Sequence, residues 1–489
     1  MSCLAVVVLA AGEGTRMKSA TLPKVLHGFA GRTLLAHVLA ATGDLDAKHT
    51  VVVIGHRRDA VREHLATIAP DAVPVVQDEQ RGTGHAVRLA LEAVPAGDEG
   101  TIVVVPGDAP LLTAPTLEAL LAEHTAAGAA ATVLSSIAED PTGYGRVIRD
   151  SAGAVVRVVE HKDATPAERA VTEVAASVYA FDHALLRDAV GRLSTANTQG
   201  EEYLPEVVSI LVADGRPVRA VVAMHDETAG VNDRVQLAAA HRAYNARLLD
   251  AHMRAGVTVV DPATTWVDAD VTLEPDVVLW PSVDLHGATS VASGAEIGPQ
   301  TTLFDTTVGE RSQIHRAVCR SSTIGNDVTL GPFAYLRPGV VLADGVHIGT
   351  YVEIKASEIG PGTKVPHLSY VGDATIGEKA NIGAATVFVN YDGVAKHHTT
   401  VGDHVRIGSD TMLIAPITIG DGAYTAAGSV IDEDVPPGAL GVARSHQRNV
   451  GGWVARKRPG SAAADAADRT GSATTPPSTQ SDTDREDRA

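Results

Sequence analysis

Apolar residues recur at every sixth position over two long stretches of the C-terminal half of the chain. One run comprises Ile324, Leu330, Leu336, Leu342, Ile348 and Ile354, and the other comprises Val401, Ile407, Leu413, Ile419, Thr425 and Ile431, with Thr425 the weakest member. A period of six fits neither an α-helix nor a single strand, and it predicts a parallel β-helix built from hexapeptide coils. In such a prism each short strand points one apolar side chain inward, and Gly supplies corner conformations that bulky residues resist.

Interruptions of this period predict where the prism carries a binding site. The period slips by one residue at Ile359 and at Ile376, and thirteen residues replace six between Phe388 and Val401. Insertions into solenoids usually lie on the binding face. We therefore expect a functional loop that contains Asn390, Tyr391 and Lys396.

The N-terminal half has a different pattern, in which short apolar runs alternate with helical ones. Strands are expected over Leu4–Ala10, Thr50–Ile54, Val73–Val76 and Thr101–Val105, and helices over Arg58–Ile68, Gly84–Val94 and Thr113–Ala127. This alternation predicts an α/β domain with a mostly parallel sheet covered on both faces. Ligands in such sheets bind beyond the carboxyl ends of the strands.

The chain of 489 residues is too long for one hydrophobic core. We expect one domain over residues 1–231, a connecting helix over 232–256 and the prism over 257–458. The connecting helix should span Asp233–Ala255, with Asn232 capping its start and Gly256 ending it. Residues 459–489 contain mostly Ser, Thr, Ala, Asp and Pro, and we expect a disordered tail there.

Charge and cysteine content limit the class of protein. A formal net charge of −19 disfavours a nucleic-acid partner, because phosphate backbones are bound by clustered Lys and Arg. Cys3 and Cys319 form no disulfide framework and suit a reducing cytosol. Leu4–Ala11 is too short for a membrane span and lacks the basic leader of a signal peptide. The expected location is cytoplasmic, with no membrane partner.

A Gly-rich turn follows the first expected strand. Gly12 and Gly14 are separated by one residue, and Arg16 and Lys24 come soon after them. Backbone N–H groups of such a turn can approach phosphate oxygens, and two cations nearby favour a polyphosphate ligand. The plainer alternatives are a structural turn and two solvated surface charges. The turn lacks both the Lys-Ser/Thr of a P-loop and the third Gly of a dinucleotide fingerprint.

Two further features of this half point to a nucleotide. The amide of Gln77 offers a donor and an acceptor in one plane, which suits the edge of a base, and Gly82 would let the backbone approach that base. Asp108 ends the fourth expected strand, where a carboxylate could hold Mg²⁺ against phosphates. The alternative for Asp108 is a turn or helix cap.

In the prism, Arg337 and Lys355 each follow an inward residue and should point outward. His367 is a candidate general base, because a neutral imidazole can accept a proton from an attacking amine. A solvated face is the alternative for the two cations. For His367 the alternatives are an ordinary surface residue and a His-metal site.

The motifs together resemble a known enzyme family. Leu9-Ala-Ala-Gly12-Glu-Gly14-Thr-Arg16-Met with Pro23-Lys24 resembles the signature of sugar nucleotidyltransferases. Further motifs narrow the choice of family. They lie at 140–146, 159–164 and 230–234, and at RPG 337–339, EIK 353–355, HLSYVGD 367–373, NIGA 381–384 and VNYDG 389–393. From about residue 4 to residue 458 the chain resembles the bacterial bifunctional N-acetylglucosamine-1-phosphate uridyltransferase and glucosamine-1-phosphate N-acetyltransferase.

This resemblance implies a role for individual residues of the first half. The implied nucleotide and sugar contacts are Leu9, Ala10, Ala11, Gly12, Lys24, Gln77, Gly82, Thr83, Gly145, Glu160 and Asn232, and the implied Mg²⁺ ligands are Asp108 and Asn232. Arg16 and Lys24 would neutralise charge while the sugar 1-phosphate attacks the α-phosphate of UTP and pyrophosphate leaves.

The resemblance assigns the second half in the same way. His367 corresponds to the proton acceptor of the acetyltransferase. The implied glucosamine-phosphate pocket is Arg337, Lys355, Tyr370, Asn381 and Lys396, and the implied acetyl-CoA contacts are Ala384, Asn390, Tyr391, Ser409, Ala427 and Arg444. The family's prism is a left-handed β-helix that forms homotrimers with acetyl-transfer sites shared between subunits. The resemblance also implies that the product, UDP-N-acetylglucosamine, supplies peptidoglycan and other cell-envelope polymers.

Two positions depart from the family pattern. Ala175 stands where the family has an Asn that hydrogen-bonds the nucleotide sugar, and Pro106 replaces a residue that is often aromatic. A lost hydrogen bond of this kind costs about 0.5–1.5 kcal/mol, so we expect a weaker but working uridyltransferase.

Two other functions compete with the bifunctional one. The first is a nucleotidyltransferase of another sugar, with the prism serving regulation or assembly. The second is a hexapeptide scaffold whose transferase sites have decayed. Neither accounts for the joint presence of His367, Arg337, Lys355 and the Asn390-Tyr391 pair at matching positions.

Overall fold

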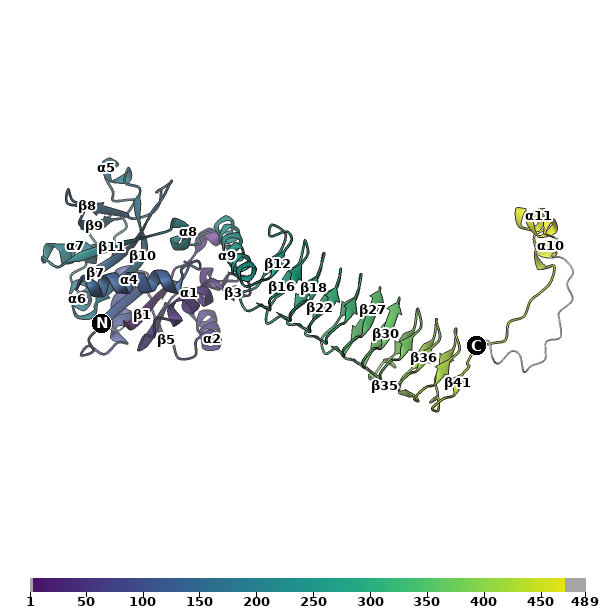
Figure 1. Cartoon of the computed structure of the whole chain (residues 1–489). Helices are drawn as coiled ribbons and strands as arrows, with labels where there is room; N and C mark the ends of the chain where they lie inside the picture. The colour runs from purple at the N-terminus through teal and green to yellow at the C-terminus, as the bar shows by residue number, and fades with distance from the viewer. Residues whose placement is uncertain (1–2, 471–489) are drawn as a thin grey trace. The chain divides into compact units, whose positions relative to one another are not determined.

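The computed structural model describes residues 3–470, which form two compact units divided between Asp250 and Ala251. The first unit is an α/β domain (Figure 1). Its strands are β1 (Cys3–Ala10), β2 (Gly28–Phe29), β3 (Arg32–Thr33), β4 (His49–Ile54), β5 (Val73–Val76), β6 (Thr101–Pro106), β7 (Ala131–Ile137), β8 (Arg146–Arg149), β9 (Val155–Val159), β10 (Glu173–Asp182) and β11 (Val218–Ala223). Its helices are α1 (Leu34–Gly43), α2 (Arg58–Ile68), α3 (Thr83–Glu92), α4 (Ala114–Ala126), α5 (Pro166–Arg169), α6 (His183–Val190), α7 (Glu206–Ala213), α8 (His225–Thr228) and α9 (Arg234–Arg254), and two 3₁₀ turns span Thr15–Met17 (η1) and Lys24–Leu26 (η2).

The main sheet has the strand order β11-β7-β10-β6-β1-β4-β5. Strands β6, β1, β4 and β5 are parallel neighbours, whereas β10 runs antiparallel between β6 and β7. All the strands and helices predicted for this half are confirmed to within two residues at each end. The carboxyl ends of β1 and β6 meet at one edge, where the Gly107 N–H donates to the Leu9 carbonyl at 2.9 Å.

Side chains of β1 alternate between two hydrophobic cores, one on each face of the sheet. Ala5 and Val7 pack with residues of α3, α6 and α7, whereas Val6 and Val8 pack with residues of α1, α2 and α4. The predicted coverage of both faces is therefore confirmed. A strand buried on both faces reads as a continuous apolar run, which explains why the sequence of β1 shows no alternation.

The start of α9 differs from the expectation. The side chain of Asp233, rather than that of Asn232, accepts hydrogen bonds from the N–H groups of Val235 and Gln236 at 2.9 and 2.8 Å. The predicted Asn232 cap is therefore wrong, because the Asn232 amide is engaged elsewhere, as described below. Gly256 follows the helix with a φ of +100°, which suits a residue that ends a helix.

The second unit is a three-sided prism of parallel strands (Figure 1). One side consists of β12 (Thr258–Val259), β15 (Val278–Leu279), β18 (Glu296–Ile297), β21 (Gln313–Ile314), β24 (Thr329–Leu330), β27 (His347–Thr350), β30 (Lys364–His367), β33 (Asn381–Ile382), β36 (Arg406–Ile407), β39 (Tyr424–Thr425) and β41 (Leu440–Gly441). The second side consists of β13 (Trp266–Val267), β16 (Asp284–His286), β19 (Thr302–Phe304), β22 (Val318–Arg320), β25 (Tyr335–Leu336), β28 (Glu353–Lys355), β31 (Tyr370–Gly372), β34 (Val387–Val389), β37 (Met412–Ile414) and β40 (Val430–Ile431). The third side consists of β14 (Thr272–Leu273), β17 (Ser290–Val291), β20 (Thr307–Val308), β23 (Thr323–Ile324), β26 (Val341–Leu342), β29 (Glu358–Ile359), β32 (Ala374–Ile376), β35 (Thr399–Val401) and β38 (Ile417–Ile419).

The predicted hexapeptide coils are confirmed, and each slip of the period shortens a coil from eighteen residues to seventeen. Leu336 pairs with Ile354 in the next coil, eighteen residues on, whereas Ile359 pairs with Ile376 after seventeen. All four side chains are buried. Ile376 then pairs with Val401, so the inserted loop leaves the prism within that coil and returns to it without disturbing the register.

The tail expectation was wrong for part of its length. Within the expected tail Ala462–Arg469 form α11, and the Ser461 side chain accepts the Ala464 N–H at 3.2 Å, whereas α10 (Trp453–Lys457) precedes the tail. Low apolar content suggested disorder, but alanine has the highest helix propensity and Ser461 caps the helix. The remainder of the expected tail, residues 471–489, lies outside the described residues. No helix within residues 3–470 is long and apolar enough to cross a membrane.

Two candidate active sites

The Gly-rich turn and the Lys24 segment are in direct contact. Gly14 has a φ of +64°, and a Cβ placed on it would lie 2.4 Å from the Cβ of Lys24. Only glycine accommodates both the backbone angle and the close approach. The turn thus brings Arg16, on η1, and Lys24, on η2, to the carboxyl end of β1.

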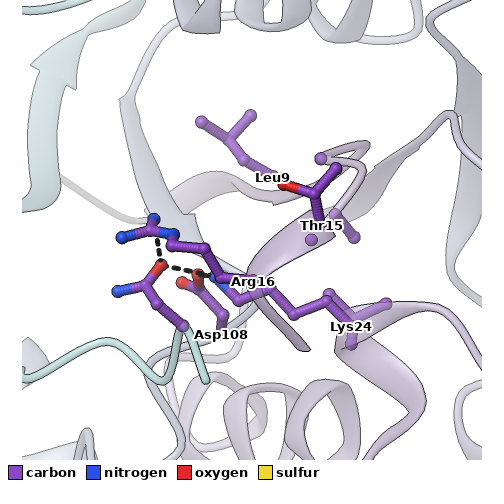
Figure 2. Close-up of a pocket in the computed structure, with 10 residues that line it drawn as sticks. Leu9, Thr15, Arg16, Lys24 and Asp108 are labelled. Atoms are coloured by element: carbon purple, nitrogen blue, oxygen red, sulfur yellow. Dashed lines mark hydrogen bonds and ion pairs between the residues drawn. The ribbon is translucent and has the colours of Figure 1, made fainter. Parts of the chain in front are cut away.

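Arg16, Lys24, Asp108 and Asn232 form one polar cluster at this edge of the sheet (Figure 2). The Lys24 ammonium forms an ion pair with the Asp108 carboxylate and also donates to the Asn232 Oδ1 at 2.8 Å. The Arg16 guanidinium donates to the same Oδ1 at 2.8 Å. A hydrogen bond from the Val231 N–H to the Asp108 carbonyl, at 2.8 Å, holds the Asn232 segment against the end of β6.

The side chains of Asp108 and Asn232 fit a magnesium ion by their donor chemistry. Because both accept from the single Lys24 ammonium, their oxygens converge on one point. Mg²⁺ prefers oxygen ligands and is usually held by one or two protein groups together with water and substrate phosphates. Among residues 3–470 no group of three His, Cys, Asp or Glu side chains is arranged to hold a metal. Asp108 and Asn232 therefore match the one or two protein ligands with which Mg²⁺ is usually held.

Two adjoining pockets open at this cluster, and Arg16, Asp108 and Asn232 line both. The first has a volume of about 250 Å³ and is lined in addition by Leu9, Ala10, Gly12, Gly14, Thr15, Lys24 and Val25. The second has a volume of about 270 Å³ and is lined in addition by Pro106, Thr142, Gly143, Tyr144, Gly145, Glu160, Ala175, Ala176, Ser177, Thr228, Gly230 and Gln236. A position is open beside Gly12, where a Cβ would meet no atom within 4 Å. The first pocket therefore offers backbone and cations, which suit phosphates.

The second pocket contains the residues that resemblance assigns to the sugar. A Cβ on Gly145 would lie 3.7 Å from the Glu160 Oε1, so these two residues face each other. Burial, together with Asp163 and Glu201, raises the pKa of Glu160. Within the part of the chain that the structure describes, no group donates a hydrogen bond to this carboxylate. Glu160 can therefore accept from sugar hydroxyls, and Ala175 lies in the same pocket with no polar side chain to offer.

Gln77, Gly82 and Thr83 lie outside these two pockets. The Gln77 amide donates to the Gly82 carbonyl and contacts the His85 Nδ1, both at 3.1 Å, and it lines a separate pocket of about 470 Å³. A Cβ on Gly82 would lie 2.5 Å from the Glu202 carbonyl oxygen, so the protein itself requires glycine there, whatever ligand binds. The Thr83 hydroxyl accepts the Leu204 N–H at 3.1 Å. Ala11, whose carbonyl accepts from the Gln80 amide at 2.8 Å, connects this region to the Gly-rich turn.

In the prism, Arg337 and Lys355 occupy equivalent positions of adjacent coils and point outward as predicted. Arg337 pairs with Glu353 at 3.2 Å, and the Lys355 ammonium lies 3.0 Å from both oxygens of Asp373. Lys396, from the inserted loop, lies beside Lys355, and a hydrogen bond with Lys355 together with its positive charge lowers the pKa of Lys396. Three cations and two carboxylates thus gather on one side of the prism, which favours an anionic ligand.

The inserted loop is fixed to this group of charges. The Asn390 amide donates to the Asp373 carboxylate and lies 3.4 Å from the Tyr370 hydroxyl. Tyr391 and Lys396 form an antiparallel bridge that closes the loop as a small hairpin. Asn390 is buried, whereas Tyr391 is exposed and available to a ligand.

His367 ends β30 and is exposed at a corner of the prism. Backbone hydrogen bonds continue along this corner from coil to coil, from Ala385 to His367, from Asp410 to Ala384, and from Gly428 to Ser409. The Arg444 Cδ lies 3.9 Å from the Cβ position of Gly428. His367, the expected general base, and four of the six expected acetyl-CoA residues therefore lie along a single corner, in the order His367, Ala384, Ser409, Ala427 and Arg444, whereas Asn390 and Tyr391 belong to the inserted loop.

Asn381 is separated from the other expected sugar-phosphate residues. It belongs to β33, where it pairs with Lys364 and Arg406, whereas Lys355 and Tyr370 belong to β28 and β31 on another side of the prism. One chain therefore does not bring Asn381 to the cations.

Sequence reasoning assigned no role to several residues that the structure places in these sites. Thr142, Tyr144, Gly230 and Gln236 line the second pocket, and Asp373 contacts both Lys355 and Asn390. Most of them lie inside the motifs at 140–146, 230–234 and 367–373. The motifs therefore indicated these segments of the chain, but they did not indicate which contact each side chain makes.

Comparisons with known proteins match both halves. Residues 6–171 match the MobA-like NTP transferase domain, and residues 321–356 and 398–433 match the bacterial transferase hexapeptide repeat. A bifunctional protein GlmU from Streptomyces coelicolor is 60% identical over 466 residues, which cover 95% of this chain and 96% of that protein. Those from Thermobifida fusca and Mycolicibacterium vanbaalenii are 57% and 55% identical over 469 and 468 residues, covering 95% and 94% of this chain and 97% and 94% of theirs.

Proposed function

Because the chain belongs to the GlmU family of bifunctional proteins, we propose that it makes UDP-N-acetylglucosamine from glucosamine 1-phosphate in two reactions at two separate sites. The observation that carries this proposal is a similarity that spans both halves of the chain at up to 60% identity. The prism, a left-handed β-helix of hexapeptide repeats, performs the acetyl transfer. The α/β domain, a nucleotidyltransferase, performs the uridyl transfer.

In the uridyltransferase site, the chain positions reactants and neutralises charge. The phosphate of N-acetylglucosamine 1-phosphate attacks the α-phosphate of UTP, a new P–O bond forms, and pyrophosphate leaves. Arg16 and Lys24 balance the negative charge of the phosphates, and Glu160 orients the sugar through its hydroxyls. Asp108 and Asn232 would hold Mg²⁺, which when bound neutralises phosphate charge.

In the acetyltransferase site, His367 acts as the general base. The amine of glucosamine 1-phosphate attacks the thioester carbonyl of acetyl-CoA, a C–N bond forms, and the C–S bond breaks. His367 takes the proton that the amine loses, and coenzyme A leaves as its thiolate, which is then protonated. Arg337, Lys355 and Lys396 bind the sugar phosphate, and the corner from Ala384 to Arg444 receives acetyl-CoA.

A homotrimer is part of this proposal. It is supported by the separation of Asn381 from Lys355 and Tyr370 on one chain, because a site shared between subunits would join them. Light scattering of the purified protein should give three times the chain mass of 50.5 kDa. A monomer with full acetyltransferase activity would overturn the shared site.

Separate assays of the two half-reactions test the proposal. Thiol release from acetyl-CoA should require glucosamine 1-phosphate, and pyrophosphate release should require N-acetylglucosamine 1-phosphate and prefer UTP. Pyrophosphate release with another sugar phosphate, and no thiol release, would favour the nucleotidyltransferase with a regulatory prism. No thiol release and no pyrophosphate release would favour the hexapeptide scaffold with decayed transferase sites.

A further inference from the structure

Asp373 lies at the point where the cations of the prism meet the inserted loop. Its carboxylate accepts hydrogen bonds from Lys355 and Asn390, and its backbone carbonyl accepts the Thr399 N–H at 3.1 Å. We propose that Asp373 is a positioning residue that joins the sugar-phosphate half of the acetyltransferase site to its acetyl-CoA half. This inference rests on the proposed acetyltransferase function.

The first contact fixes a flexible cation. The Lys355 ammonium lies 3.0 Å from both oxygens of Asp373, and the two side chains are 15% and 20% exposed. A lysine side chain has several rotatable bonds and loses much freedom when it binds an anion. Because Asp373 already holds Lys355 in place, binding of the sugar phosphate does not have to restrict the Lys355 side chain further.

The second contact fixes the inserted loop at both ends. Asn390 begins the loop and Thr399 ends it, and both bind Asp373, one through the side chain and one through the backbone. Gly372 makes this convergence possible, since a Cβ there would lie 2.6 Å from the Asn390 Nδ2 and 2.4 Å from the Tyr370 hydroxyl. Loss of the Asp373 carboxylate would therefore release the residue expected to contact acetyl-CoA.

The charge of Asp373 also keeps two like charges together. Lys396 forms a hydrogen bond with Lys355 and is also repelled by its charge, and Arg337 adds a third positive charge to the group. Burial alone would raise the pKa of Asp373, but the bonds from Lys355 and Asn390 lower it, so the carboxylate is ionised at neutral pH. Glu353 pairs with Arg337, which leaves Asp373 as the carboxylate in contact with Lys355.

The backbone at Asp373 allows a substitution that tests charge alone. Its φ is +50°, a left-handed conformation that Asn tolerates as well as Asp does. Asp373→Asn keeps the shape and the corner while removing the negative charge. Asp344→Asn is the matched control, because Asp344 is an exposed corner carboxylate of the same prism whose Oδ1 accepts the Asn326 N–H at 2.7 Å.

The test uses steady-state kinetics of the full-length chain. In Asp373→Asn we expect the KM for glucosamine 1-phosphate to rise about tenfold, the typical effect of losing a charged hydrogen bond. The KM for acetyl-CoA should rise by a smaller factor, and kcat should change little. The thermal midpoint and the uridyltransferase activity of the same chain should match the wild type, and Asp344→Asn should match it in every assay.

A double-mutant cycle shows whether Asp373 acts through Lys355. In a Lys355→Met background, Asp373→Asn should no longer raise the KM for glucosamine 1-phosphate, because the cation that it positions is gone. Additive effects, wild-type KM values in Asp373→Asn, or a loss of kcat together with a lower thermal midpoint would each overturn the proposal. A wild-type enzyme that releases no thiol would instead overturn the acetyltransferase function itself.

Discussion

The Lys24 ammonium donates to the Asn232 amide oxygen at 2.8 Å and pairs with the Asp108 carboxylate, across more than eighty residues of sequence in each case. It thus satisfies both of the oxygens that would hold Mg²⁺. A metal ion at that point must displace the ammonium, which would then be available to phosphate oxygens. Lys24 is therefore the counter-ion of the Asp108 carboxylate.

Replacing Lys24 by Met should have opposite effects on metal binding and on catalysis. We expect Lys24→Met to bind Mg²⁺ more tightly than the wild type in titration calorimetry without nucleotide, because the competing cation is absent. Its uridyltransferase kcat should fall about 100-fold, because a charge that stabilises the transition state is lost. Lys48→Met, which removes a lysine paired with Asp98 at 2.5 Å, is the control and should change neither quantity. Weaker Mg²⁺ binding in Lys24→Met would contradict this account.

Ala175→Asn should improve the uridyltransferase. Ala175 lines the same pocket as Gly145 and Glu160, so an amide there can reach a bound sugar. One new hydrogen bond is worth about 0.5–1.5 kcal/mol, so the KM for N-acetylglucosamine 1-phosphate should fall by up to about tenfold. The acetyltransferase kinetics of the same variant serve as the control. Unchanged KM and kcat for the uridyl transfer would show that Ala175 does not limit this enzyme.

Glu160→Gln should stabilise the protein while weakening sugar binding. Burial raises the pKa of Glu160 above its ordinary value of 4.5, so the folded state holds this proton more tightly than the unfolded state does. Stability is therefore lost as pH rises from that ordinary value through the raised pKa. The variant should show a smaller fall in thermal midpoint over this range and a higher KM for N-acetylglucosamine 1-phosphate. If the thermal midpoints of the wild type and the variant depended equally on pH, a raised pKa of Glu160 in the folded state would be refuted.

Gly349→Ala should destabilise the prism. A Cβ at Gly349 would lie 1.9 Å from the Pro366 carbonyl oxygen of the next coil, so the coils must separate locally. Overpacking of this kind costs about 1–3 kcal/mol. Gly43→Ala, at the end of α1 with no atom within 4 Å of the added carbon, should be neutral or slightly stabilising. Chemical denaturation of both variants measures the difference, and equal midpoints would contradict the tight spacing of the coils.

The fold was largely predictable from the sequence, because periodicity reports directly on burial. The residues at six-residue spacing from Ile324 to Ile354 are all buried, and the slips at Ile359 and Ile376 mark the coils next to the inserted loop. The caps were harder to predict, since Asn232 and Asp233 are both good N-cap residues. Asp233 caps α9 because Asn232 faces Arg16 and Lys24, a contact between distant segments.

The site contacts were predictable only where motifs specify them. Arg16, Lys24, Asp108 and Asn232 were expected at one site, and the structure gathers them. Gly82 was expected to let the backbone approach a base; the Glu202 backbone also requires glycine there, through an approach between segments that no local pattern reveals. Asp373 was likewise missed, because its importance lies in joining Lys355 to Asn390 across three strands.

The most direct test of the whole account is synthesis of UDP-N-acetylglucosamine by His367→Ala. Supplied with UTP, acetyl-CoA and glucosamine 1-phosphate, the variant should form this product at least about 100-fold more slowly than the wild type, because the general base is missing. Supplied with UTP and N-acetylglucosamine 1-phosphate, it should match the wild type. Normal synthesis from glucosamine 1-phosphate, or loss of synthesis from both substrates, would contradict two independent sites with His367 as the base of one.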